Sequence, residues 1–439
     1  EMRSLLTEQA DEGAIKMFGL NLKPLLMQPP VKGFVTMGLD PGYRNGCKVA
    51  VVDATGKVLD TAVVYPTFSQ RKKEEAIDTL AKLIRRHGVA HIAIGNGTAS
   101  RETEQMTVEL IRRLGGGVSY MIVNEAGASV YSASKLAAEE FPDYDVNLRS
   151  AVSIARRLQD PLAELVKIDP KSIGVGQYQH DMPQARLDET LSGVVEDCVN
   201  AVGVDLNTAS APLLSYVAGL NNTTARNIVK YREENGAFTT RKGVLKVPKL
   251  GPKAFEQCAG FLRVPESRNV LDHTGVHPES YGAAEALLTL CGYGLSDVKA
   301  GGLDGLRERV AAYGEEKAAQ ACGVGVPTLR DIVGELMKPG RDPRDELPRP
   351  ILRTDVLEMK DLKPGMELTG TVRNVIDFGV FVDIGVHQDG LVHISQLREG
   401  RRVQHPSEVC AVGDIVTVWV LEVDEKKKRI SLTMKKPKG

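Results

Sequence analysis

The order of short apolar runs in the first third of the chain is the feature that most constrains its fold. Three runs, Phe34–Asp40, Cys47–Asp53 and Val58–Tyr65, are separated by turn sequences rich in Asp, Gly and Asn. This pattern predicts an antiparallel meander of three strands. Two further strands are expected at 89–94 and 119–123, each after a segment with helical spacing.

Three helices complete this order. One ends at Gly88, as a helix with a left-handed glycine cap does, and the others are expected at 101–114 and 126–140. The resulting order, β-β-β-α-β-α-β-α, predicts a mixed sheet with helices on its faces.

A multi-domain protein is expected, because 439 residues correspond to about three folded units. Four prolines between 339 and 350 predict an extended linker, and alternating Val, Ile and Phe runs after it predict a small antiparallel barrel. The expected units are a helical segment (1–32), an α/β domain (33–160), a helical connector (161–205), a region of short helices and tight turns (206–264), a small helical domain of unknown role (265–338), the linker (339–362) and the barrel (363–437).

Charge and cysteine content exclude several classes of protein. Because 56 basic residues balance 57 acidic ones, a nucleic-acid site has to be local. The six cysteines form no CxxC pair, which argues against a zinc site or a disulfide framework and indicates the cytoplasm. No apolar stretch approaches the length of a membrane span, and the start at Glu1-Met2 inside a helical pattern indicates a fragment.

The barrel carries the most specific motifs. Leu362-Lys-Pro-Gly-Met-Glu, Asp377-Phe-Gly-Val-Phe-Val-Asp-Ile and Asp389-Gly-Leu-Val-His-Ile-Ser closely resemble the ribosomal-type S1 RNA-binding domain, an all-β OB-fold barrel, over 363–436. We expect Val380, Val382 and Ile384 to face the core, with Phe381 on the other side and Phe378 emerging at a bend. The resemblance implies that the RNA-binding residues are Phe378, Phe381, His393, Asp424 and Arg429.

Two alternatives apply to this barrel. Aromatic residues in a barrel usually belong to its core, so both phenylalanines have a purely structural explanation. Seven basic residues near the C-terminus form either a solvated tail or a phosphate-attracting surface. They are Lys426, Lys427, Lys428, Arg429, Lys435, Lys436 and Lys438.

Two segments in 206–264 resemble the helix-hairpin-helix motif, in which a glycine-rich turn leads into a helix N-terminus that can hold a phosphate. They are Val217–Ala225 and Val247–Ala254. Asn221 replaces the second glycine of the first hairpin, where we expect it to tolerate a left-handed conformation, and Lys249 replaces the first glycine of the second.

The expected phosphate-binding residues of these hairpins are Gly219, Thr223, Gly251 and Lys253. Nine basic and three acidic residues between 222 and 263 give this region a local charge of +6. The alternative is that the hairpins only pack helices together. Sequence-independent contact with a backbone is the functional prediction.

The α/β domain, with Gly38-Leu-Asp-Pro-Gly42 ending its first strand, resembles the ribonuclease-H-like fold of the YqgF and RuvC resolvase group. The resemblance implies carboxylates around two Mg²⁺ ions, with Asp40, Glu125 and Asp160 at the catalytic positions. Asn96 stands where an acid would serve that chemistry. We therefore expect a degenerate nuclease and no cofactor, with an active, Mg²⁺-dependent nuclease as the alternative.

Structural explanations exist for these residues as well. Asp40-Pro41-Gly42 is a common turn sequence, and Asp160 before Pro161 is a good helix start. Gly95-Asn-Gly-Thr after a strand is a weak signal for a phosphate-holding turn, and no GxxxxGK[ST] loop accompanies it.

Taken in order, these regions resemble the Tex family of bacterial transcription accessory proteins over essentially the whole chain. Ile173–Asp181 and Val195–Ser210 look characteristic of that family. The resemblance implies a nucleic-acid-binding factor linked to transcription, with RNA, DNA and the transcription machinery as expected partners. A monomer without membrane contact is expected.

Overall fold

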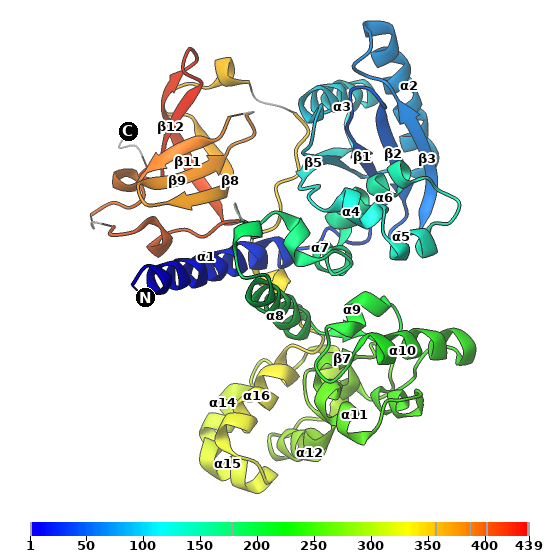
Figure 1. Ribbon diagram of the computed structural model, residues 1–439. Coiled ribbons are helices and arrows are strands. Elements are labelled where there is room, and N and C mark those ends of the chain that lie inside the picture. Colours follow the sequence, from blue (N-terminus) through cyan, green and yellow to red (C-terminus); the bar gives the residue numbers. More distant parts are fainter. Residues whose placement is uncertain (1, 177–178, 356–357, 387, 401–402, 437–439) are drawn as a thin grey trace. The chain divides into compact units, whose positions relative to one another are not determined.

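The computed structural model describes all residues except 1, 177–178, 356–357, 387, 401–402 and 437–439 (Figure 1). Lys438 of the basic tail and parts of the predicted linker and barrel therefore lie outside the described residues. The chain forms two compact units, one made of Glu1–Asp188 with Pro348–Gly439 and the other of Glu189–Leu347. The division falls inside the segment 161–205 that the sequence predicted as a connector.

The α/β domain of the first unit is built on a mixed five-stranded sheet of order β3-β2-β1-β4-β5. The first three strands are antiparallel, whereas β4 lies parallel to β1 and β5 parallel to β4. This arrangement confirms the predicted mixed sheet. The strands are β1 (Thr36–Asp40), β2 (Cys47–Val52), β3 (Val58–Val64), β4 (His91–Gly95) and β5 (Ser119–Val123).

Helices cover both faces of this sheet. Alternate β2 residues divide between the faces, so Val49 and Val51 enter the larger core whereas Ala50 and Val52 pack against α6. The larger core also includes α2 (Gln70–His87) and α3 (Ser100–Leu114), and α6 spans Val146–Gln159. Gly88 ends α2 in the left-handed conformation, at φ 67°, as the sequence predicted.

The single helix predicted at 126–140 is wrong. The segment forms two short helices, α4 (Ala128–Ser132) and α5 (Lys135–Glu140). The side chain of Ser134 accepts the backbone N–H of Ala137 at 3.2 Å, which starts α5 as a separate helix.

The rest of the first unit's helical part is short, apart from two long helices. The long helices are α1 (Met2–Leu26) and α8 (Gln184–Val202), and the short elements are α7 (Pro161–Leu165) and 3₁₀ turns at Pro170–Ile173 and Gln179–Asp181. Helix α8 continues into the second unit. Among the described residues, no helix is both long and apolar enough to cross a membrane.

The predicted linker is anchored rather than freely extended. The backbone of Arg353 exchanges two hydrogen bonds, of 2.7 and 2.8 Å, with that of Tyr120 on the edge strand β5. Asp355 continues this contact through an ion pair with Arg112 at 2.7 Å. Upstream, Pro343–Glu346 forms a 3₁₀ turn in which the buried side chain of Arg344 binds Asp342. The segment predicted as an extended linker over 339–362 thus makes specific contacts with the α/β domain at Arg353 and Asp355.

The C-terminal domain is a closed barrel of order β10-β12-β11-β8-β9. Val380 and Val382 are fully buried in its core and Ile384 is 1% exposed, which confirms the predicted alternation. The strands are β8 (Glu367–Ile376), β9 (Gly379–Asp383), β10 (Gly390–His393), β11 (Ile415–Asp424) and β12 (Arg429–Thr433).

The second unit is helical, with a two-stranded parallel sheet that joins the ends of the hairpin region. This sheet pairs β6 (Val204–Asp205) with β7 (Leu262–Arg263). A separate apolar core holds the later helices together. The helices are α9 (Ala211–Ser215), α10 (Asn222–Asn235), α11 (Pro252–Cys258), α12 (Tyr281–Leu290), α13 (Leu295–Ala300), α14 (Leu306–Tyr313), α15 (Glu315–Cys322) and α16 (Val326–Met337).

Candidate nucleic-acid interface

One outer face of the barrel, here called the barrel face, is formed by β9, β10 and β12. Phe381 pairs with Leu391, and Leu391 pairs with Ser431, so these three side chains form a row across the strands. Their neighbours Val380, Val382 and Val392 are buried in the core, which directs the row outward. Phe381 is half-buried there and is not part of the core cluster.

Phe378 and His393 lie at one end of this face. Gly379, next to Phe378, is the register partner of His393. A Cβ on Gly379 would lie 2.4 Å from the carbonyl oxygen of Val392, so only glycine permits this approach. Phe378 occupies the turn between β8 and β9 with 53% of its surface exposed. The core explanation for the two phenylalanines is therefore wrong.

Asp424 and Arg429 lie at the other end of the barrel face. They are register partners in the β11–β12 hairpin, and Arg429 comes two residues before Ser431 on β12. From Arg429 to Phe378 the face extends five residue steps, or about 17 Å along the strands. The structure thus brings Phe381, His393, Asp424 and Arg429 onto one face, with Phe378 in the turn at one end of it.

The two hairpins of the second unit differ in how the helix that follows each of them begins. In the first, Gly219 has the positive φ of 80° and Asn221 is extended, at φ −138°. The side chain of Asn221 accepts the N–H groups of Thr223 and Thr224 at 2.9 and 3.0 Å. Asn221 therefore does not use the left-handed conformation that asparagine tolerates, and the N–H of Thr223, near which a phosphate was predicted, already has a partner.

The second hairpin lacks such a cap. Lys249 takes the left-handed conformation, at φ 64°, and Gly251 precedes α11 without a side-chain hydrogen bond to the helix start. The hairpins also support each other, since Asn227 on α10 donates to the carbonyl of Pro248 at 2.9 Å. The exposed Lys249 and Lys253 side chains therefore accompany an open helix start.

The charge of the hairpin region is smaller at its surface than in its sequence. Arg241 is fully buried, where it donates to backbone carbonyls such as that of Val276. Arg232 and Arg263 are half-buried and also donate to carbonyls. Six basic residues and the three acidic ones stay exposed, so +3 rather than +6 faces solvent. The exposed basic residues are Arg226, Lys230, Lys242, Lys246, Lys249 and Lys253.

In the α/β domain, Asp40 and Glu125 lie close enough to interact. Burial and the charge of Glu125 raise the pKa of Asp40 to about 6, although Lys48 opposes the shift. Burial also raises the pKa of Glu125, against the N–H of Gly97 and the charge of Arg157. Arg157 in turn fixes the loop that carries Glu125, by donating to the carbonyls of its two sequence neighbours at 2.8 Å.

The turn after β4 holds the Glu125 carboxylate. A Cβ on Gly97 would lie 1.8 Å from Glu125 Oε1, and one on Gly95 would lie 2.2 Å from Oε2. Asn96, between them, accepts the backbone N–H of Glu125 at 3.0 Å. The glycine-rich turn that suggested a phosphate site therefore encloses a carboxylate of the same domain.

Asp160 has a structural role. It caps α7 by accepting the N–H of Ala163 at 3.2 Å and pairs with Lys32 at 3.0 Å. Within the described part of the chain, no three His, Cys, Asp or Glu side chains gather as a metal would require. The two carboxylates at Asp40 and Glu125, with a neutral Asn96 already bonded, do not fit a pair of Mg²⁺ ions.

Family comparisons cover most of the chain in four segments. The Tex protein YqgF-like domain matches residues 34–159, a helix-hairpin-helix motif matches 199–263, and the S1 RNA binding domain matches 361–435. An HHH domain matches 269–344, where sequence reasoning found no motif. The missed signal is Gly323-Val-Gly325 between α15 and α16, in which Gly323 has φ 72°.

Three bacterial relatives align with almost the whole chain. The uncharacterized protein YdcI of Bacillus subtilis is 57% identical, the transcriptional accessory protein Tex of Neisseria gonorrhoeae 56%, and protein YhgF of Escherichia coli 55%. Each alignment covers 99% of this chain. The chain spans 60%, 56% and 55% of their respective lengths.

Proposed function

The chain is a Tex-like protein, and on this premise we propose that it is a nucleic-acid-binding transcription accessory factor. Its barrel stacks the bases of single-stranded RNA, and its second hairpin contacts a nucleic-acid backbone of RNA or DNA. It acts as a monomer in the cytoplasm, alongside the transcription machinery. The proposal assigns no catalytic step to the α/β domain.

The observation that carries the proposal is the exposure of Phe378 on the barrel face. A phenylalanine that is 53% exposed in a turn contributes little to the core, and it directly precedes Gly379, the register partner of His393. Aromatic rings on a surface of this kind stack with bases whatever their sequence, at about 1–3 kcal/mol per base. Arg429, exposed at the far end, adds attraction for the phosphates.

Fluorescence anisotropy with a labelled single-stranded RNA tests the barrel. The double variant Phe378→Ala with Phe381→Ala should lower the affinity at least tenfold, since each lost stack is worth about 1–3 kcal/mol. Leu421→Ala removes another exposed apolar side chain of the same barrel and should leave the affinity unchanged. Equal affinity of the double variant and the unmodified chain would show that the barrel face does not stack bases.

A cleavage assay tests the rival function. Labelled single-stranded and branched substrates are incubated with the protein and Mg²⁺ or Mn²⁺. We expect no cleavage, because Asp160 is engaged in capping α7 and Asn96 is neutral. Cleavage that Asp40→Asn abolishes would replace the binding-only function with a nuclease.

A further inference from the structure

The α/β domain contains a buried lysine that has no hydrogen-bonding partner in the described part of the chain. Lys48 on β2 is only 8% exposed. Its Nζ makes no hydrogen bond or ion pair with any described residue. Asp40, its register partner on β1, acts on it only through space. Most of the side chain is buried while the ammonium lines an open cavity, so an anion from outside the chain can reach this charge.

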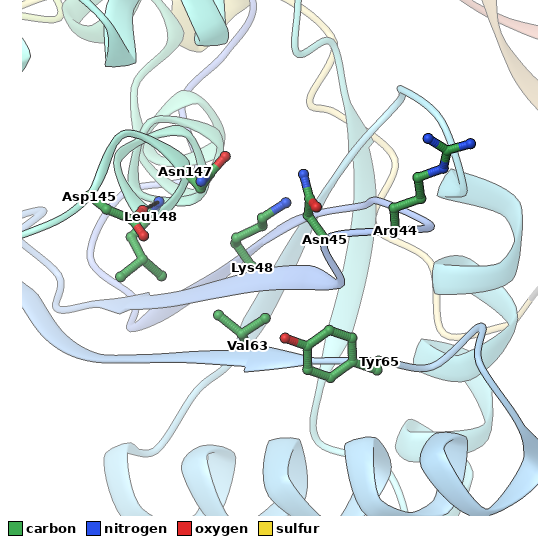
Figure 2. A pocket seen from close by; sticks show the side chains of 8 residues that line it. All are labelled: Arg44, Asn45, Lys48, Val63, Tyr65, Asp145, Asn147 and Leu148. Atoms are coloured by element: carbon green, nitrogen blue, oxygen red, sulfur yellow. Dashed lines mark hydrogen bonds between the residues drawn. The ribbon is translucent and has the colours of Figure 1, made fainter.

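This lysine opens into a cavity, here called the Lys48 pocket, with a volume of about 370 Å³. Arg44 and Asn45 from the β1–β2 turn line one side, and Asn147 at the start of α6 lines the other (Figure 2). Figure 2 shows the Lys48 ammonium directed into the space between Asn45 and Asn147. Tyr65, after β3, closes the pocket from the sheet side.

Sheet geometry explains why Lys48 reaches this place. Residues two apart on a strand share a face, so Lys48 lies on the same side as Ala50 and Val52, which pack beneath α6. It lies two residues closer to the start of β2 than Ala50 does. Its side chain therefore extends past the beginning of α6 at Val146, the positive end of a 14-residue helix.

The chemistry of the lining favours a phosphate group. Two cations, Arg44 and Lys48, and two amides, Asn45 and Asn147, line the pocket. The acid on the lining, Asp145, already caps α6 by accepting the N–H of Leu148 at 3.0 Å. Cations together with a helix start are the usual donors to a tetrahedral oxyanion. Arg44, Asn45 and Asn147 are exposed, so the pocket is accessible from solvent.

We propose that the Lys48 pocket binds one phosphate group of a nucleic-acid backbone, with Lys48 inside the pocket and Arg44 at the rim. This rests on the proposed function for the nature of the ligand, and it adds a contact site in a domain to which that function assigns none. The contact is sequence-independent and involves no bond cleavage.

The test measures anisotropy with a labelled 12-nucleotide RNA and the matching DNA at several salt concentrations. Lys48→Met and Arg44→Gln should each lower the affinity about threefold to tenfold and reduce the salt slope by about one. Asn147→Asp, an exposed change that keeps a good residue at a helix start, should do the same by placing a carboxylate in the pocket. Lys57→Met, an exposed cation between β2 and β3, is the matched control and should change neither quantity.

Two further measurements distinguish a failure of this inference from a failure of the proposed function. Each variant is also made with Phe378→Ala and Phe381→Ala, where the pocket effect should persist on a weaker background. Loss of the barrel effect alone would then contradict the proposed function, whereas loss of the pocket effect alone would contradict this inference. Calorimetry with inorganic phosphate is the second measurement. Phosphate binding that depends on Lys48 without any effect on RNA or DNA would identify a free-phosphate site and overturn the backbone assignment.

If Lys48→Met fails to fold, Arg44→Gln and Asn147→Asp carry the test on the folded chain. Unchanged affinity and salt slope in both would reduce Lys48 to a counter-charge for Asp40 and overturn the proposal.

Discussion

At the scale of single residues, burial disfavours the charged form of both carboxyl groups of the α/β domain, Asp40 and Glu125. The pKa of Asp40 rises from 3.8 to about 6 because of burial and the nearby Glu125. Between these pH values the folded chain holds a proton that the unfolded chain has lost. The free energy of unfolding therefore falls as the pH rises through this window, by about 3 kcal/mol at most.

Replacing Asp40 by a neutral isostere should remove this penalty. We expect Asp40→Asn to raise the free energy of unfolding by about 1–3 kcal/mol at pH 7.5 and to leave it nearly unchanged at pH 3.5, where the folded carboxyl is protonated. Urea unfolding at both pH values measures the difference. Asp53→Asn is the control with opposite sign, because the Asp53 carboxylate accepts hydrogen bonds from Thr55 and Lys57. A destabilised Asp40→Asn at pH 7.5 would mean that the carboxylate is favourably paired.

At the scale of elements, the two hairpins resemble each other in sequence, but the residues that replace a glycine of the motif have different structural roles in them. Asn221 closes the start of α10 with its own side chain. Lys249 instead keeps the left-handed turn that a glycine would form without strain. A left-handed lysine costs stability, so its charge is the simplest reason for its presence beside the open start of α11.

Substitution of Lys249 separates strain from charge. Lys249→Gly should raise the free energy of unfolding by about 0.5–1 kcal/mol, because it relieves the left-handed conformation. The same change should weaken DNA binding and lower the salt slope by about one. Lys246→Asn removes a nearby exposed charge from an ordinary conformation and should not stabilise the protein. Stabilisation with unchanged DNA binding would show that the second hairpin only packs helices.

Elements set by local patterns could be predicted from the sequence, and those set by distant contacts could not. The alternation of Val380, Phe381 and Val382 encodes which side faces solvent, so the barrel face was predictable. Asn221 was not, because asparagine suits both a left-handed turn and an extended helix cap. The pairing of Arg353 with Tyr120 joins residues more than two hundred positions apart and leaves no local pattern.

At the scale of the whole molecule, the balanced net charge includes two groups of basic residues, one buried and one exposed to solvent. Basic residues such as Arg157 and Arg241 are buried and hold backbone carbonyls in place. Basic residues of the second hairpin and of the β11–β12 turn are exposed. A net charge of −1 therefore restricts nucleic acid to a few small surfaces, each of which makes few phosphate contacts.

This organisation predicts that the second unit folds and binds by itself. A fragment of residues 184–347 keeps α8 whole and contains its own apolar core, formed by side chains such as Leu287, Leu306 and Leu329. We expect a helical circular dichroism spectrum and one cooperative transition in urea. Leu287→Asp should abolish that transition, since the side chain is fully buried. The folded fragment lacks the barrel and should still bind DNA, more weakly than the full chain. A fragment that unfolds gradually, without a transition, would mean that the second unit depends on the first for its stability.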